Sequence, residues 1–163
     1  MSEEKLALAA ALGVVLGARG WKVATAESCT GGLIAGVITD VGGSSGWFDR
    51  GFVTYSDESK VEMLGVRRET LAAHGAVSEE TARAMAAGGL ARSSADLVVA
   101  VTGVAGPSGG TPDKPVGLVC FGWAMRSAAV ETATRHFTGD RAAIRDATVV
   151  AALVGLLERL RAS

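Results

Sequence analysis

The chain has 163 residues, of which 48% are hydrophobic, and its formal net charge at neutral pH is −1. This length and apolar share suit one globular domain with a full hydrophobic core, so we expect residues 1–163 to form a single domain. The balanced charge argues against the basic surface that nucleic-acid or membrane-surface binding requires. A small molecule is therefore the expected partner.

Hydrophobic patterning and cysteine usage predict a cytoplasmic protein. Each apolar run is interrupted well short of a membrane span, and the N-terminus opens on Ser2, Glu3 and Glu4 without the basic start of a signal peptide. Cys29 and Cys120 lie far apart in the sequence, which is not the pattern of a disulfide framework. With so few histidines and cysteines, we expect no metal site and no other cofactor.

Helices and strands are predicted to alternate along most of the chain. Helices are marked by apolar residues at intervals of three or four, with Ser or Asp at their starts and Gly at their ends. Strands are marked by continuous apolar or β-branched runs. In chain order, the sequence predicts a helix at 3–19, a strand at 21–26, a helix at 33–41, a strand at 48–55, helices at 57–64, 68–74 and 79–93, strands at 95–102, 116–125 and 130–137, and a last helix opened by Gly139-Asp140.

This order of elements predicts a three-layer α/β/α sandwich with a mixed, mostly parallel sheet. The strands at 116–125 and 130–137 are joined by too few residues for a crossover, so they should form a C-terminal antiparallel hairpin. Ligands of open α/β sheets bind beyond the carboxyl ends of strands. We therefore expect the turn at Ser28, the segment after Tyr55 and the loop after Thr102 to converge on one crevice.

The turn at residues 27–32 reads ESCTGG and joins a predicted strand to a predicted helix. Free amide groups and the dipole at a helix start favour developing negative charge, which makes Ser28 a candidate nucleophile or part of an anion site. The alternative is a simple helix cap built from small residues. Cys29 is a competing nucleophile, although no cation that would activate its thiol is evident nearby in the sequence.

A serine nucleophile needs a base, and the sequence offers few. His74 precedes a helix-stopping glycine and His136 falls within a predicted strand, so a histidine triad is poorly supported. Lys60 lies about one turn into the helix at 57–64 and could act as a base if it were neutral, although a surface lysine is the simpler interpretation of its spacing alone. Tyr55, the only tyrosine, could assist proton transfer or pack in the core.

Two glycine-rich loops and two arginines could bind an anion. The loops at 42–46 and 103–110 offer backbone amides, although the second lacks the spacing of dinucleotide and P-loop motifs. Arg141 and Arg145 lie one turn apart at the start of the last helix, where a cation is unfavourable unless an anion is bound. The alternative is a pair of solvated arginines.

Five segments in fixed order resemble the nicotinamide-nucleotide amidase family, also called the C-terminal domain of the competence/damage-inducible protein CinA. They are AESCTGG at 26–32, GFVTYS at 51–56 followed by Lys60, GAVS at 75–78, VAGP at 104–107 and KPVG at 114–117. The resemblance covers almost the whole chain. It implies conversion of nicotinamide mononucleotide to nicotinate mononucleotide and ammonia, in pyridine-nucleotide recycling. Larger members carry an additional N-terminal domain, and this sequence resembles the stand-alone form.

The resemblance also implies a serine hydrolase without a histidine triad, in which Ser28 is the nucleophile, Lys60 its base and Tyr55 an assistant. A homodimer or higher homo-oligomer is a further expectation at the family level. The alternatives are a non-catalytic nucleotide-binding regulatory module, in which the two glycine-rich loops hold the ligand, and an oligomerisation domain. The family likeness and the anion argument together assign substrate binding to Thr30, Gly31, Ser44, Ser45, Thr102, Gly103, Gly106, Arg141 and Arg145.

Overall fold

A five-stranded sheet with the order β2-β1-β3-β4-β5 lies at the centre of the computed structural model, which describes residues 2–163. Strand β1 pairs in parallel with β2 and β3, whereas β4 is antiparallel to both β3 and β5. The predicted mixed sheet and its C-terminal hairpin are confirmed. The strands are β1 (Val23–Glu27), β2 (Phe48–Val53), β3 (Leu97–Gly103), β4 (Leu118–Met125) and β5 (Glu131–His136).

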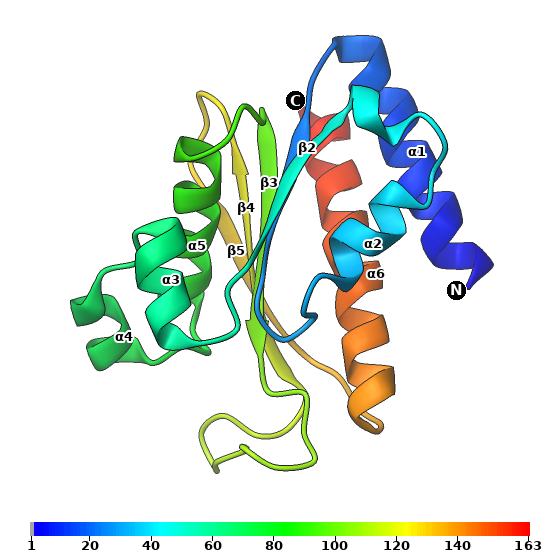
Figure 1. Cartoon of the computed structure of the whole chain (residues 1–163). Helices are drawn as coiled ribbons and strands as arrows, with labels where there is room; N and C mark the ends of the chain where they lie inside the picture. The colour runs from blue at the N-terminus through cyan, green and yellow to red at the C-terminus, as the bar shows by residue number, and fades with distance from the viewer. Residues whose placement is uncertain (1) are drawn as a thin grey trace.

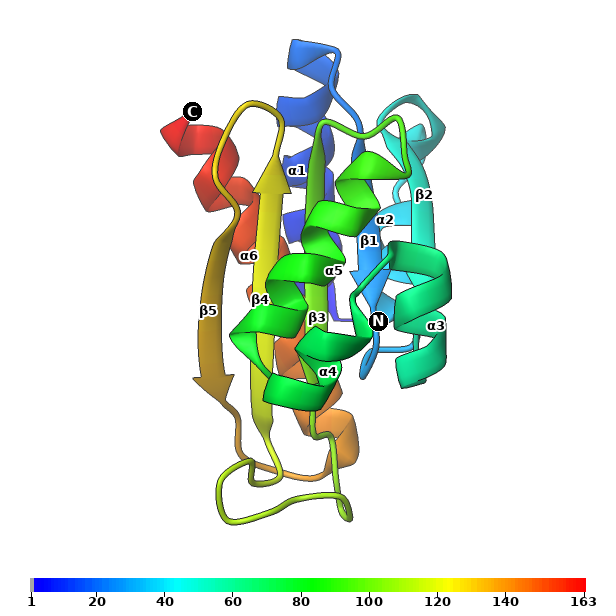
Figure 2. The same cartoon turned by 90° about the vertical axis from the view of Figure 1, so that its left-hand side faces the viewer.

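Helices cover both faces of this sheet and complete the predicted three layers (Figure 1). One face carries α1 (Glu3–Arg19), α2 (Leu33–Thr39) and α6 (Arg141–Ala162). The other carries α3 (Asp57–Leu64), α4 (Arg68–His74) and α5 (Glu79–Ala91), which lie in front of the sheet in Figure 2. Successive residues of β3 face opposite cores, with Val99 in the cluster on the α6 side and Val98 in the cluster on the α5 side. Both faces are buried, as the continuous apolar runs predicted.

The predicted caps hold the helix ends. The hydroxyl of Ser56 accepts a hydrogen bond from the Ser59 amide at 3.1 Å at the start of α3, and Gly65 ends this helix with a left-handed φ of 68°. Some bounds differ from prediction. The strand predicted from residue 21 begins at Val23, because the Trp21 amide donates to the Leu16 carbonyl and extends the end of α1.

A close approach between α5 and α3 fixes the position of the helix that carries Lys60. A Cβ atom added at Gly88 would lie 1.9 Å from the carbonyl oxygen of Leu64, so only glycine allows this contact. The last turn of α3 therefore rests directly on the α5 backbone, and α5 in turn packs on the sheet.

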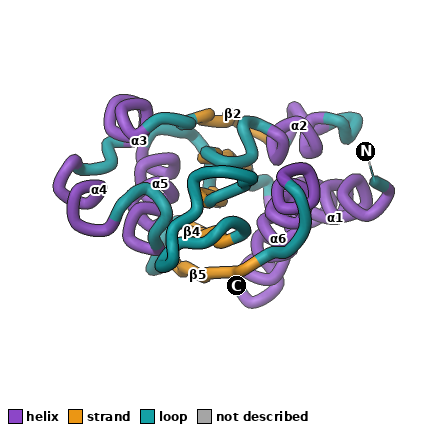
Figure 3. The backbone as a smooth tube through the Cα atoms, turned by 90° about the horizontal axis from the view of Figure 1, so that it is seen from below, coloured by secondary structure: helices purple, strands orange, loops and turns teal. Residues whose placement is uncertain are grey.

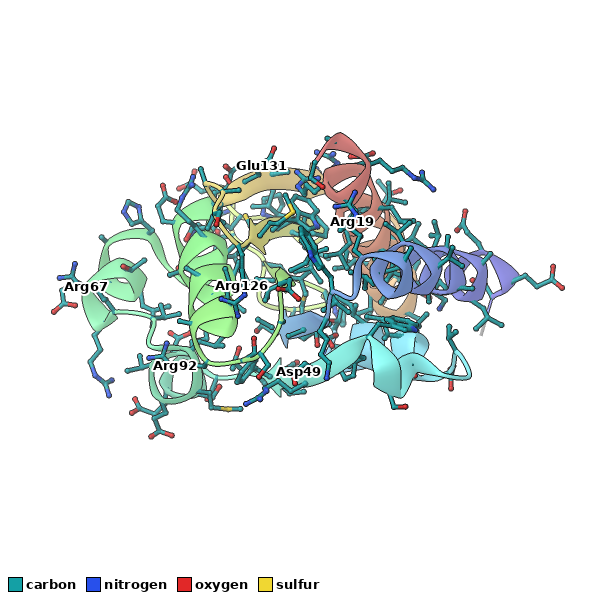
Figure 4. All side chains as sticks on the ribbon, turned by 90° about the horizontal axis from the view of Figure 1, so that it is seen from above. Arg19, Asp49, Arg67, Arg92, Arg126 and Glu131 are labelled. Atoms are coloured by element: carbon teal, nitrogen blue, oxygen red, sulfur yellow. The ribbon has the colours of Figure 1, made fainter. Side chains whose placement is uncertain are left out.

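The carboxyl ends of β1, β2 and β3 lie at one edge of the sheet, the lower edge in Figure 1. The segment after β3 and the start of α6 lie at the same edge, and Figure 3 shows these loops from below. The opposite edge carries charged side chains such as Asp49, Arg92 and Arg126 (Figure 4). No helix within residues 2–163 is both long enough and apolar enough to cross a membrane.

Candidate active site

Lys60 and Ser28 are in direct contact although they lie on different elements. Ser28 directly follows β1, Lys60 lies one turn into α3, and Lys60 Nζ is 3.0 Å from Ser28 Oγ. The same nitrogen lies 2.9 Å from the carbonyl oxygen of Thr54, which follows β2. Lys60 is only 1% exposed and Ser28 is 7% exposed. The fold thus places the predicted base beside the predicted nucleophile in a nearly dry environment.

The surroundings of Lys60 favour its neutral form. Burial lowers the pKa of Lys60 because the ammonium ion loses its hydration, while the carboxylate of Asp57 acts in the opposite direction. A neutral amine has a lone pair and two N–H groups. The structure has Nζ donating both to the Thr54 carbonyl and to Ser28 Oγ. A neutral amine in this place can keep the bond to Thr54 and turn its lone pair to the Ser28 hydroxyl proton, which is what a general base needs.

Glu27 organises the turn from one side. Its side chain is fully buried, and one oxygen accepts from the Thr30 hydroxyl at 2.6 Å and from the Ile34 amide at 2.9 Å. The other oxygen accepts from the Ala35 amide at 3.0 Å. These two amides at the start of α2 are therefore not free to bind an anionic ligand, because the protein's own carboxylate already occupies them.

Arg145 holds the same turn from the other side. Its Nε donates to the Cys29 carbonyl at 3.1 Å and its Nη2 donates to the Thr30 carbonyl at 3.2 Å. Gly31 closes the turn, since its amide donates to the Ser28 carbonyl at 3.0 Å. Thr30, Gly31 and Arg145 were predicted to bind substrate. The Thr30 hydroxyl, the Gly31 amide and two nitrogens of Arg145 instead make hydrogen bonds within the turn, whereas the backbone amide of Thr30 makes none there.

The Cys29 thiol is a poor competitor for the role of nucleophile. Burial raises its pKa to about 12, mainly through loss of hydration, so the thiol stays protonated near neutral pH. Because the thiolate is the reactive form, Ser28 with its adjacent amine is the better candidate.

A cleft of about 200 Å³ opens in front of Ser28 and Lys60. A neighbouring cavity of about 470 Å³ shares Ala105 and Arg141 with it, so the two are adjacent. The cleft is lined by Ser28, Cys29, Tyr55, Asp57, Lys60, Ala76, Val77, Thr102, Gly103, Ala105 and Arg141. The predicted convergence of the three strand ends on one crevice is confirmed.

Tyr55 and Arg141 meet at the mouth of this cleft. The phenol is 62% exposed, which rules out the core aromatic that the sequence left open, and its oxygen accepts from Arg141 Nη2 at 3.0 Å. Arg141 Nη1 donates to the Gly106 carbonyl at 2.8 Å, so Gly106 supports the arginine without lining the cleft itself. Thr102 lines the cleft, and its hydroxyl donates to the Ala76 carbonyl at 2.8 Å.

Ser44 and Ser45 do not belong to this site, which corrects the prediction. They form a short turn of 3₁₀ helix immediately before β2. Because β1 and β2 are parallel, the start of β2 lies at the edge of the sheet opposite to the end of β1, where Ser28 is found. The glycine-rich loop at 42–46 is therefore separated from the cleft by the length of a strand.

Neither histidine lines the cleft. His74 Nδ1 lies 3.8 Å from a Glu80 carboxylate oxygen on the outer surface, and His136 Nε2 lies 3.2 Å from the Val116 carbonyl. A larger hollow of about 460 Å³ between α6 and the β4–β5 hairpin is lined by no serine, cysteine, lysine or histidine, so it offers no nucleophile and base. Within residues 2–163, no three histidine, cysteine or acidic side chains are grouped as a metal site would require.

Sequence reasoning assigned no role to Asp57, Ala76, Val77 or Ala105, all of which line the cleft. Asp57 carried a usable signal, because it lies three residues before Lys60 and residues with that spacing share one face of a helix. The small apolar residues lie within the GAVS and VAGP segments of the family resemblance, but nothing in their spacing separates a cleft wall from an ordinary core position.

Comparison with known proteins identifies close relatives over nearly the full length. The family model of the CinA C-terminal domain matches residues 5–160. A protein named nicotinamide-nucleotide amidohydrolase PncC from Enterobacter agglomerans is 55% identical over 146 residues, covering 89% of this chain and 89% of the relative. A protein of the same name from Escherichia coli strain K12 is 51% identical over 156 residues, covering 96% and 94%.

Solved structures agree with this likeness. The crystal structure of the competence/damage inducible protein CihA from Agrobacterium tumefaciens matches with a TM-score of 0.94 at 48% sequence identity, covering 99% of this chain and 98% of the other. A CinA superfamily protein from Klebsiella pneumoniae matches with a TM-score of 0.93 at 41% identity, covering 98% and 99%.

Proposed function

The chain belongs to the CinA C-terminal domain family, and from this premise we propose that it hydrolyses nicotinamide mononucleotide to nicotinate mononucleotide and ammonia. Relatives that bear the name nicotinamide-nucleotide amidohydrolase support this choice at 51% and 55% identity. The observation that supports the chemistry is the 3.0 Å contact between the buried Lys60 amine and the Ser28 hydroxyl. Such an enzyme returns the nucleotide to NAD recycling as nicotinate mononucleotide.

In the proposed first step, neutral Lys60 takes the hydroxyl proton of Ser28 while Oγ attacks the carboxamide carbon. The positive charge of the substrate's pyridinium ring helps to keep Lys60 unprotonated beforehand, because like charges disfavour the charged amine. The carbonyl oxygen of the substrate becomes an oxyanion. The amide of Ser28 cannot stabilise it, since that amide already donates to the Val101 carbonyl at 3.0 Å. The amides of Cys29 and Thr30, next along the turn, are the proposed donors.

Collapse of the tetrahedral intermediate breaks the C–N bond. Lys60 returns its proton to the departing nitrogen, ammonia leaves, and the acyl group remains on Ser28 as an ester. Lys60 then removes a proton from water, the resulting hydroxide attacks the ester, and Ser28 recovers its proton through Lys60 as nicotinate mononucleotide forms. Tyr55, whose phenol faces the mouth of the cleft, is proposed to orient the carboxamide or to assist this proton transfer.

The two adjacent cavities suit the two halves of the substrate. The cleft of about 200 Å³ is proposed to hold the pyridine carboxamide between Thr102, Gly103 and the catalytic pair. The neighbouring cavity of about 470 Å³ is proposed to hold the ribose phosphate, with Arg141 on the boundary between them as the cation closest to the phosphate.

A panel of pyridine amides with ammonia release as the readout tests the function. We expect turnover of nicotinamide mononucleotide to exceed that of the riboside, because the riboside lacks the phosphate and its contacts in the second cavity. Turnover of the riboside should exceed that of free nicotinamide, which also lacks the ribose. Binding of the mononucleotide without ammonia release from any amide would instead support the non-catalytic nucleotide-binding module.

The pH dependence of kcat/KM should respond to Asp57. The base must be neutral, so kcat/KM rises as the pH increases through the pKa of Lys60. The Asp57 carboxylate raises that pKa, so Asp57→Asn lowers it and moves the acid limb of the profile to lower pH. Glu58→Gln is the matched control, because Glu58 lies in the same turn but pairs with Arg68 at 2.7 Å, and its acid limb should stay in place. An unmoved limb in Asp57→Asn would contradict the assignment of Lys60 as the titrating base.

We further propose that the chain acts in the cytoplasm and forms a homodimer or higher homo-oligomer. Support for self-association comes from β2, which is an edge strand, and from the exposed apolar side chains of Leu33 (42%) and Val53 (46%). Gel filtration with light scattering would test the oligomeric state.

A further inference from the structure

We propose that Arg145 is a positioning residue for the reaction, which holds the peptide after Cys29 so that the Cys29 and Thr30 amides can bind the oxyanion. This inference rests on the proposed hydrolysis. It departs from the expectation that Arg145 clamps the substrate's phosphate, and it assigns Arg145 an effect on the chemical step.

Two of the three guanidinium nitrogens of Arg145 donate to the backbone of the turn. Nε and Nη2 donate to the Cys29 and Thr30 carbonyls at 3.1 and 3.2 Å, and these are the two carbonyls that follow the nucleophile residue directly. The guanidinium lies against Gly31, where an added Cβ would be 3.5 Å from Nη2. Arg145 does not line the cleft, whereas Arg141, one turn earlier on α6, does.

Because the peptide after Cys29 is trans, the contact of Arg145 with the Cys29 carbonyl also fixes the direction of an oxyanion donor. In a trans peptide the C=O and the following N–H point in opposite directions. Among residues 2–163 only the Gly106–Pro107 peptide is cis, so the peptide between Cys29 and Thr30 is trans. With its carbonyl fixed on Arg145, its Thr30 N–H must point away from Arg145.

The preceding peptide is fixed in the same manner. The Ser28 carbonyl accepts from the Gly31 amide at 3.0 Å, which sets the direction of the Cys29 N–H. Within the part of the chain that the structure describes, neither the Cys29 amide nor the Thr30 amide donates to another residue, and the Cys29 amide contacts only the thiol of its own side chain. Two such amides immediately after a nucleophile are the donors that an oxyanion requires.

Two opposed anchors keep this turn from relaxing. Arg145 holds the carbonyls, and the buried carboxylate of Glu27 holds the Thr30 hydroxyl at 2.6 Å from the opposite side. A cationic donor on a peptide oxygen also polarises that peptide and strengthens its N–H as a donor. Arg145 thus acts on the transition state through the Cys29–Thr30 peptide rather than by contact with the substrate.

Substitution of Arg145 by methionine separates this role from phosphate binding. Loss of an aligned oxyanion donor lowers kcat by about 100-fold in comparable sites, and we expect Arg145→Met to show a loss of that order with little change in KM. The loss should be equal for nicotinamide mononucleotide and for nicotinamide riboside, because the defect does not involve the phosphate. Arg161→Met, which removes an exposed guanidinium from the last turn of α6, is the matched control and should retain wild-type kcat and KM.

A transition-state mimic and chemical rescue exclude a merely structural effect. The aldehyde analogue of the mononucleotide, which adds to Ser28 and creates the oxyanion, should bind Arg145→Met more weakly by the same factor as kcat falls. Added guanidinium, at concentrations far below those that unfold proteins, should restore part of kcat. Arg145→Lys keeps the charge but cannot span both carbonyls, so its kcat should lie between those of the methionine variant and wild type. This variant also provides the test if Arg145→Met does not fold.

Two results would overturn the proposal. One is an increase in KM confined to the mononucleotide, which would make Arg145 a phosphate ligand. The other is wild-type kcat in a folded Arg145→Met. Failure of the proposed function would look different, because the wild-type protein itself would then release no ammonia.

Discussion

Lys60→Met is expected to lower kcat for ammonia release from nicotinamide mononucleotide by about 10⁴-fold while nucleotide binding is retained. Lys60 is the only ionisable side chain in hydrogen-bond contact with Ser28 among the described residues, so its removal leaves the hydroxyl without a base. Methionine fills a similar volume without a proton acceptor. The measurement is a single-turnover assay of ammonia together with equilibrium binding of the product nucleotide.

The stability of this variant provides an independent check on its folding. The folded-state pKa of Lys60 lies below the ordinary value of 10.5, so between these two values the unfolded chain binds more protons than the folded one. The free energy of unfolding of the wild type therefore gains from this group as the pH rises through that window. Methionine does not titrate. Relative to wild type, Lys60→Met should be most stable at acidic pH and should lose that advantage towards alkaline pH.

Two outcomes would contradict the assigned base. Wild-type turnover in Lys60→Met would show that another group activates Ser28. A stability difference between the two proteins that does not vary with pH would show that Lys60 keeps an ordinary pKa in the folded state, which the buried contact with Ser28 and Thr54 argues against.

Ser28→Ala is expected to abolish turnover, with kcat reduced by at least about 10⁴-fold, because no acyl-enzyme can form. Lys60 and the turn amides remain in place, so binding of nicotinamide mononucleotide should persist. Mass spectrometry of the wild type, quenched during turnover, should detect the nicotinoyl nucleotide as an ester on Ser28, and the same adduct should be absent from the variant.

The same experiment can detect Cys29 as an alternative nucleophile. Its thiol is buried and its pKa is raised to about 12, so it should not replace the missing hydroxyl at neutral pH. Turnover that survived in Ser28→Ala but disappeared in Cys29→Ala would identify the thiol as the nucleophile and reject the serine mechanism.

The fold could be predicted from sequence because its signals are local. Capping residues such as Ser56 and Gly65 set the ends of α3, and the continuous apolar run before Gly103 predicted the buried strand β3. The short connection between β4 and β5 predicted their antiparallel pairing. Errors are confined to element ends, where competing hydrogen bonds such as that from the Trp21 amide decide the boundary.

The site could be predicted only in part, because its remaining features depend on contacts between distant segments. Ser28 follows a strand and precedes a helix, so its setting was legible from sequence. The 3.0 Å contact with Lys60 could not be derived from spacing or composition, because it depends on how α3 packs against the sheet, and only the family resemblance paired Lys60 with Ser28. Ser44 and Ser45 were misplaced because a glycine-rich loop has the same composition at either edge of a sheet. Arg145 was taken for a ligand-binding cation because charge patterning does not reveal that two of its nitrogens donate to backbone carbonyls.

The direct contact between the backbone of Gly88 and Leu64 makes the activity sensitive to substitution at a position outside the cleft. The position of the Lys60 amine depends on the contact between α3 and α5, and α5 contributes no group to the reaction. Any side chain introduced at Gly88 would push α3 away from α5 and move Lys60 away from Ser28, while every residue that faces the nucleotide stayed unaltered. Inherited loss of activity could thus arise at a site that a comparison of cleft residues alone would pass over.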